Sequence, residues 1–154
     1  MSIKTLKTTQ ILPLSLEKAW AFFSSPANLN DITPSDMRFD ITSEVPAKMY
    51  EGLIITYKVS PFMNLPLDWV TEITHIREPH YFVDEQRKGP YRIWHHEHHF
   101  RKVDGGVEMT DILHYDMGKW VFGWLASLLF VDRKVRHIFS FREKKLLELF
   151  PAEG

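Results

Sequence analysis

The run His95-His96-Glu97-His98-His99 holds four of the eight histidines of the chain, and its residue types could transfer a proton or bind a metal ion. In an extended strand, alternate side chains share a face, so His96 and His98 lie together, opposite His95, Glu97 and His99. Imidazole titrates close to neutral pH and is a common metal ligand. The spacing therefore predicts that His96 and His98 act as a pair.

Two carboxylates on neighbouring predicted strands, Asp84 and Asp111, fall on the same side of the sheet as His96 and His98. Within 91–103, the face that carries His96 and His98 also carries two large aromatic rings, which favours it as the buried face. The same alternation in 67–77, 81–88 and 107–117 brings further side chains inward. The predicted inward and ligand-binding set is Trp69, Thr71, Phe82, Asp84, Gln86, Trp94, His96, His98, Phe100, Met109, Asp111, Leu113 and Tyr115.

An inward carboxylate must be paired, because burying a lone charge costs on the order of several kcal/mol. We therefore expect at least one Asp–His hydrogen bond inside the protein, among Asp84, Asp111, His96 and His98. These four are also the candidate general acids and bases. A self-satisfied network is favoured over catalysis, since no recognisable nucleophile accompanies them. No metal is predicted, because the spacing is that of a plain strand, and no cofactor motif is present.

The elements that position these groups follow from periodicity and turn residues across one predicted domain, 1–154. A strand is expected over 3–12, then a helix capped by Ser15 with Leu16, Ala19, Trp20 and Phe23 on one face, and further helical turns over 27–32. Period-two patterns follow, separated by turn signals such as 61–66 and 104–106. They predict strands over 37–42, 52–60, 67–77, 81–88, 91–103 and 107–117.

A long helix closes the chain, from about residue 130 to 150. Its apolar stripe is predicted to contain Val131, Val135, Ile138, Phe139, Leu146 and Leu149. Short connections make the strands antiparallel neighbours, and one apolar sheet face must be covered, for which this helix is long enough. The expected fold is α+β: a seven-stranded curved antiparallel sheet around a C-terminal helix, with an unfilled hollow between them.

Composition excludes several classes of function. The formal net charge is −1 with no basic run, so nucleic acid is not an expected partner, and the absence of cysteine excludes disulfides and thiolate chemistry. The first residues lack a secretory signal pattern, and a cytoplasmic location is expected. The apolar stretch Trp120–Val131 is too short to cross a membrane. It is predicted to be the buried start of the last helix, a gate or transient membrane contact, or a surface for a second protein.

Three stretches together resemble the START-like, or SRPBCC, superfamily of helix-grip proteins, and specifically its polyketide cyclase/dehydrase-like and ligand-binding members. The first stretch runs from Ala21–Ser24 through Asn28-Leu29 to Ile32–Pro34. The second is Trp69-x-Thr71-x-Ile73, followed by Phe82-x-Asp84-x-Gln86 and Gly89-Pro90. The third is Trp94-x-His96-x-His98-x-Phe100, followed by Asp111 and Tyr115. The resemblance spans nearly the whole chain. It implies the fold above, but relatives of this shape differ widely in function.

The expected function is binding or carriage of a small hydrophobic molecule that is lipid, isoprenoid, sterol-like or polyketide-like. Its apolar part is expected against Trp69, Trp94 and Phe100, and its polar end near the His and Asp residues. The alternative is a cyclase/dehydrase-type enzyme in which an Asp-supported His acts as general acid and base in the same cavity.

Overall fold

The computed structural model describes residues 3–37, 39–62, 65–118 and 124–152. Seven strands form one antiparallel sheet in the order β1-β7-β6-β5-β4-β3-β2, so each strand after β2 pairs with its neighbour in sequence and β7 returns to β1. The predicted fold class is confirmed. The strands are β1 Lys4–Leu12, β2 Phe39–Ile41, β3 Ile54–Phe62, β4 Leu65–Arg77, β5 Tyr81–Lys88, β6 Ile93–Val103 and β7 Gly106–Asp116.

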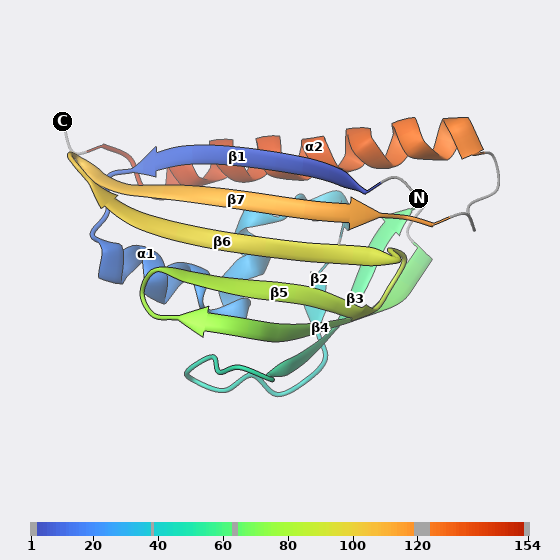
Figure 1. The fold of residues 1–154 in the computed structure, drawn as a ribbon, viewed down its shortest axis with the longest axis horizontal. Coiled ribbons are helices and arrows are strands. Elements are labelled where there is room, and N and C mark those ends of the chain that lie inside the picture. Colours follow the sequence, from blue (N-terminus) through green and yellow to red (C-terminus); the bar gives the residue numbers. More distant parts are fainter. Residues whose placement is uncertain (1–2, 38, 63–64, 119–123, 153–154) are drawn as a thin grey trace.

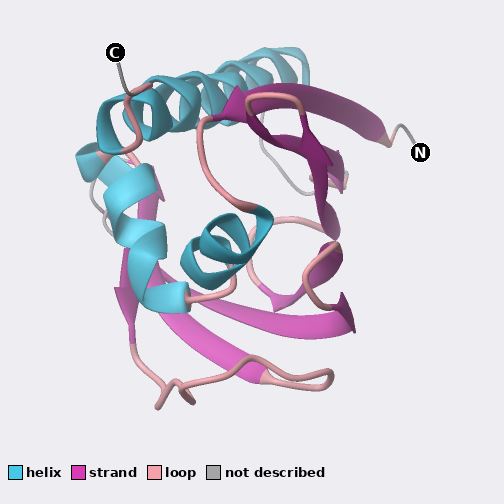
Figure 2. Cartoon of the chain, turned by 90° about the vertical axis from the view of Figure 1, so that its left-hand side faces the viewer, coloured by secondary structure: helices cyan, strands magenta, loops and turns pink. Residues whose placement is uncertain are grey.

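Helices cover the concave face of this sheet (Figures 1 and 2). The long helix α2, Trp124–Leu149, runs along the molecule, and α1, Leu16–Phe23, lies with the 3₁₀ segment η1, Pro26–Ile32, between β1 and β2 in sequence. As predicted, Ser15 caps α1, its side chain accepting a hydrogen bond from the backbone N–H of Lys18. A second 3₁₀ turn, η2 Ser35–Met37, replaces the start of the strand predicted over 37–42.

Pro61 lies inside β3, whereas the sequence pattern predicts a turn over 61–66. The pairing of β3 with β4 shifts register between Val59 and Phe62. Such an irregularity accommodates a proline in a strand, because proline has no N–H to donate to the ladder. The strands therefore extend further toward the turn than predicted: β3 ends at Phe62 instead of residue 60, and β4 begins at Leu65 instead of residue 67.

The sequence parity correctly identifies the inward face of β6 and β7. The inward side chains of β7, from Val107 to Tyr115, are all buried, and His96, His98 and Phe100 of β6 are buried as well. The sheet pairs these two strands without a register shift from Ile93 to Val103. The side chains of His95 and His99 face outward, where His95 is hydrogen-bonded to Glu85 and His99 to Glu97.

The core consists of two hydrophobic clusters. The larger cluster joins α1, β3, β5 and the C-terminal part of α2 through residues such as Trp20, Ile55 and Leu146; the smaller contains Leu113, Tyr115, Val131, Val135 and Phe139. Four of the six predicted stripe residues of α2 are buried, and Ile138 is half-buried. Leu149 is 39% exposed, contrary to the prediction, because it is the final residue of the helix.

The apolar stretch Trp120–Val131 falls partly outside the described residues. Helix α2 begins at Trp124, and Val131 is buried in the smaller cluster. Residues 119–123 are not described, so the roles predicted for this stretch stay predictions. Among the helices that are described, none combines the length and apolar character needed to cross a membrane.

Candidate functional site

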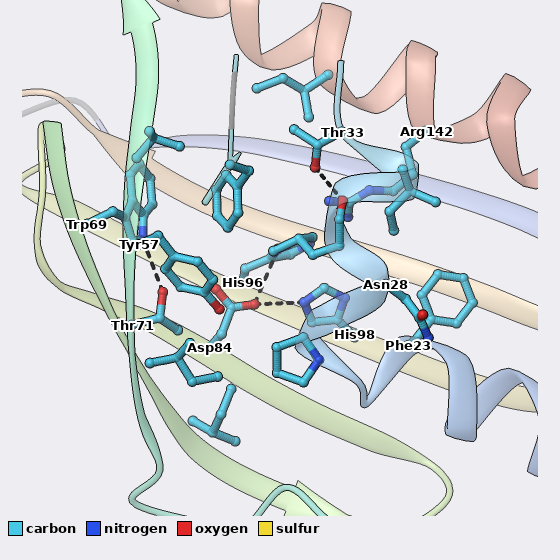
Figure 3. Close-up of a pocket in the computed structure, with 18 of the residues that line it drawn as sticks. Phe23, Asn28, Thr33, Tyr57, Trp69, Thr71, Asp84, His96, His98 and Arg142 are labelled. Carbon is cyan, nitrogen blue, oxygen red and sulfur yellow. Dashed lines mark hydrogen bonds and ion pairs between the residues drawn. The ribbon is translucent and has the colours of Figure 1, made fainter. Parts of the chain in front are cut away.

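A cavity of about 150 Å³ lies between the concave face of the sheet and the helices. Its wall combines side chains from α1, η1, strands β2 to β6 and α2, and most of them are apolar. Figure 3 shows Asp84, His96 and His98 side by side on this wall and Arg142 entering from α2, whereas Asn28, Thr33 and Thr71 lie at other places around the cavity. The cavity is therefore mainly apolar, and its acidic and histidine side chains form one polar corner.

Four side chains form a network at the polar corner, which we call the tetrad: the buried His96, His98 and Asp111 and the half-buried Asp84. Asp111 lies opposite His98 on the paired strands, and Asp84 lies opposite His96. The hydrogen bonds run diagonally: Nε2 of His96 is 3.0 Å from Oδ1 of Asp111, and Nε2 of His98 is 2.7 Å from Oδ2 of Asp84. The predicted Asp–His hydrogen bonds inside the protein are confirmed.

Secondary contacts tie the tetrad together. Nδ1 of His98 is also 3.0 Å from Oδ1 of Asp111, but its N–H has no well-directed hydrogen bond, so this contact is mainly electrostatic. The His98 ring stacks on Phe82 with centroids 4.2 Å apart. The side chain of Asp84 is 18% exposed, whereas that of Asp111 is 3% exposed. Asp84 and His98 thus face the cavity, and Asp111 supports both imidazoles from behind.

The electrostatics of the tetrad separate its two histidines. Burial disfavours the cation of each, but hydrogen bonds and charge from Asp111 and Asp84 outweigh burial at His98 and raise its pKa. At His96, burial together with the charge of His98 prevails and lowers the pKa. Burial also opposes ionisation of the two carboxylates, yet their histidine partners outweigh it and lower the pKa of Asp84 and Asp111. The tetrad therefore favours the carboxylate form of both acids, the cation at His98 and the neutral imidazole at His96.

These shifts predict that acid destabilises the protein. Because the pKa values of Asp84 and Asp111 are lowered by folding, their stabilisation is present above about pH 4, where carboxyl groups of an unfolded chain titrate, and is lost as pH falls toward the folded values. His98 acts in the opposite sense, since its stabilisation is lost as pH rises through its raised pKa. Urea denaturation between pH 3 and 7 should show this acid-side loss, and Asp111→Asn should flatten it. An equally steep acid limb in that variant would contradict the assignment.

The tetrad also offers a set of metal-ligand atoms. One ligand atom each from Asp84, His96 and His98 lies within 4.8 Å of the other two. Each imidazole turns its other nitrogen toward Asp111, as ligating histidines often do toward a carboxylate. A divalent ion would, however, have to displace the proton between His98 and Asp84, and Arg142 adds positive charge nearby. These three residues could hold an ion, but the network is complete without one.

Seven of the thirteen predicted ligand-binding residues line the cavity: Trp69, Thr71, Phe82, Asp84, Trp94, His96 and His98. Trp69 and Trp94 contact edge to face, with centroids 5.2 Å apart. Nε1 of Trp69 donates to Oγ1 of Thr71 over 3.0 Å, which fixes the indole against the wall. Contact of these side chains with a ligand remains a prediction.

The other six lie behind the cavity wall or beside it. Phe100 packs against Trp20 and Phe23, while Met109 and Leu113 are in the core. Asp111 is behind the imidazoles, and the hydroxyl of Tyr115 donates to Asp132.

Gln86 holds the turn between β5 and β6 through the backbone of Tyr91. A Cβ atom on Gly89 would lie 2.3 Å from Oε1 of Gln86, so a larger residue there would displace the Gln86 amide from the backbone of Tyr91.

Several residues that line the cavity were not predicted from the sequence. Tyr57 from β3 and Arg142 from α2 add polar groups, and burial with the charge of Asp84 raises the pKa of Tyr57, which keeps it a neutral phenol. Phe22 and Phe23 of α1 pack against the larger hydrophobic cluster and also line the cavity. Arg142 follows Ile138 and Phe139 at i+4 and i+3, so it occupies a position on the apolar stripe of α2. Its place on the apolar stripe is the feature of the sequence from which its burial could have been predicted.

Comparison with known proteins shows the fold. No family model matches the chain, and no curated protein matches it. Among solved structures, protein Ms6760 from Mycobacterium smegmatis shares 18% identity over 97% of this chain and 96% of its own, with a TM-score of 0.67. Protein CV1439 from Chromobacterium violaceum shares 9% over 97% and 99%, with a TM-score of 0.72. Ara h 8.0201 shares 13% over 96% and 99%, with a TM-score of 0.61. These similarities, together with the sheet order and the covering helix, show that the chain adopts the helix-grip fold.

Proposed function

We propose that the protein binds a small, mainly apolar molecule in the cavity between sheet and helices. The observation that carries this proposal is the cavity itself, a hollow of about 150 Å³ with aromatic and aliphatic walls and one polar corner. Pockets of this kind, apolar with a few converging polar groups, are typical of small-molecule sites. Membership of the START-like superfamily, which the helix-grip fold supports, is part of the same proposal.

The walls suggest how such a molecule lies. Trp69, Trp94 and Phe139 present apolar surface, against which a ring or chain gains about 25 cal/mol per Å² removed from water. Asp84 and His98 offer an acceptor and a donor at the polar corner. A lipid, isoprenoid, sterol-like or polyketide-like molecule with one oxygenated end satisfies both regions.

A fluorescent probe and two adjacent α2 positions test the proposal. N-phenyl-1-naphthylamine is neutral and apolar and should bind with enhanced emission. Ile138→Trp puts an indole into the cavity and should weaken this binding by about tenfold or more, since the lost volume excludes the probe. His137→Trp adds the same indole at an exposed neighbouring position and should leave binding unchanged. Equal binding by both variants, or none by the unaltered protein, would contradict the proposal. Solvent extraction and mass spectrometry of the purified protein would identify a resident ligand.

A second candidate function is acid–base catalysis in the same cavity, as in a cyclase/dehydrase. The observation that favours it is the His98–Asp84 pair, which faces the cavity and in which the pKa of the imidazole is raised by its carboxylate partners. Extracted ligand returned to the ligand-free protein would lose the mass of one water if the pair catalyses dehydration. His98→Gln should then slow the loss by about 10²- to 10⁴-fold, whereas recovery of unchanged ligand in every case would favour a binder.

A further inference from the structure

Arg142 is a buried cation without a direct anionic partner. Its side chain belongs to α2, only 8% of the residue is exposed, and it lines the cavity (Figure 3). Among the described residues, no carboxylate lies within ion-pair distance of its guanidinium, whose Cζ is 5.3 Å from the centroid of the Phe139 ring. Among the same residues, its buried Nε has no hydrogen-bond partner. The tetrad, by contrast, is held together by two Asp–His hydrogen bonds of its own, and only Nδ1 of His98 lacks a well-directed partner there.

A buried guanidinium is stabilised by a hydrogen-bond acceptor. It carries five N–H donors and no acceptor, and buried donors that stay unpaired cost about 1–3 kcal/mol each. Natural structures leave few such groups without a partner. Nε itself is buried, but Arg142 lines the cavity, so a bound molecule can supply an oxygen acceptor to the terminal N–H groups of the guanidinium.

The charges around the cavity determine whether the ligand oxygen that accepts from Arg142 is neutral or anionic. Asp84 and Asp111 are carboxylates, since the pKa of each is lowered, and the positive charge beside them comes from Arg142 and from the protonated form of His98, whose pKa is raised. The positive charge of these groups therefore does not exceed the negative charge already present, and Arg142 lowers the pKa of Asp84 through space. An anionic ligand would add an uncompensated buried charge, whereas a neutral acceptor leaves the balance intact.

We infer, building on the proposed function, that the ligand is a neutral apolar molecule with a carbonyl oxygen that accepts hydrogen bonds from Arg142. The class includes ketones, esters and polyketide-like molecules. It excludes free fatty acids and other carboxylates as preferred ligands. Arg142 is thus assigned as the residue that selects the polar end of the ligand.

The test uses 6-propionyl-2-(dimethylamino)naphthalene, a neutral ketone whose emission moves to longer wavelength when its carbonyl accepts a hydrogen bond. The matched anion is 6-(dimethylamino)naphthalene-2-carboxylate. We expect the ketone to bind more tightly than the carboxylate. Arg142→Met keeps the length of the side chain, and should weaken ketone binding by about tenfold or more and move the bound emission to shorter wavelength. N-phenyl-1-naphthylamine, which has no carbonyl, should change by less than about threefold.

Lys144→Met is the matched control, because it removes one positive charge from an exposed position on the same helix. It should leave the binding of both neutral probes unchanged. Arg142→Lys keeps the charge with a different donor geometry, and should give an intermediate ketone affinity with the red-shifted emission partly kept.

The inference and the proposed function fail in different ways. Unchanged ketone affinity and emission in Arg142→Met, or tighter binding of the carboxylate by the unaltered protein, would overturn the inference while binding of N-phenyl-1-naphthylamine keeps the proposed function. Absence of binding by every probe would overturn both. If Arg142→Met does not fold, Arg142→Lys decides by the emission of the bound ketone.

Discussion

Asp111→Ala should lower the free energy of unfolding by about 3–5 kcal/mol at neutral pH. Asp111 is the common partner of both tetrad imidazoles, and its side chain is only 3% exposed. Its removal leaves the cation of His98 short of one counter-charge and the N–H of His96 without an acceptor. Urea denaturation followed by far-ultraviolet circular dichroism measures the change.

Glu108→Ala provides the control on the same strand. Glu108 points to the other side of the sheet, and its carboxylate is paired with Arg101, whose side chain is 71% exposed. Exposed pairs of this kind contribute between about 0 and 1 kcal/mol. Similar losses in the two variants would show that the inward network does not stabilise the fold.

Leu146→Ala should cost about 2–5 kcal/mol of unfolding free energy. Leu146 is fully buried in the larger hydrophobic cluster, where α2 packs against the rest of the core. The truncated side chain leaves a void that the packed neighbours fill only in part, so lost burial and lost contacts add together. Thermal and urea denaturation should both report the loss.

Leu147→Ala, one residue further along, should change stability by less than about 0.5 kcal/mol. Leu147 is 53% exposed, so truncation removes little buried surface. The adjacent pair therefore tests which face of α2 meets the sheet. A larger cost at Leu147 than at Leu146 would require the helix to be rotated about its axis.

The sequence predicts the site best where the strands are regular. On β6 and β7 the pairing has no register shift, so simple alternation placed His96, His98 and Asp111 on the correct face. Strand β4 shifts register twice against β5, around Val70 and between Ile73 and His75. Such bulges depend on the partner strand as well as on local sequence, and alternation within one strand does not show them. Val83 is buried although alternation places it outward.

Two of the polar residues that were missed, Tyr57 and Arg142, illustrate a different limit. Arginine is rarely buried, so composition places Arg142 among the charged residues around it at the end of α2. Its burial depends on the cavity, which forms only when α2, η1 and five strands come together. A polar residue on an apolar stripe is a local signal, but its partner is set by tertiary structure.

The division of the core into two clusters has a consequence for how the cavity opens to a ligand. The N-terminal half of α2 is anchored in the smaller cluster through Val131 and Val135, whereas Leu146 anchors its far end in the larger one. A displacement of the first half would disrupt the smaller cluster and the contacts of Asp132 with Lys4 and Tyr115, while the other end of the helix stays packed in the larger cluster and acts as a pivot. Opening and global unfolding can therefore be separate events with separate free energies.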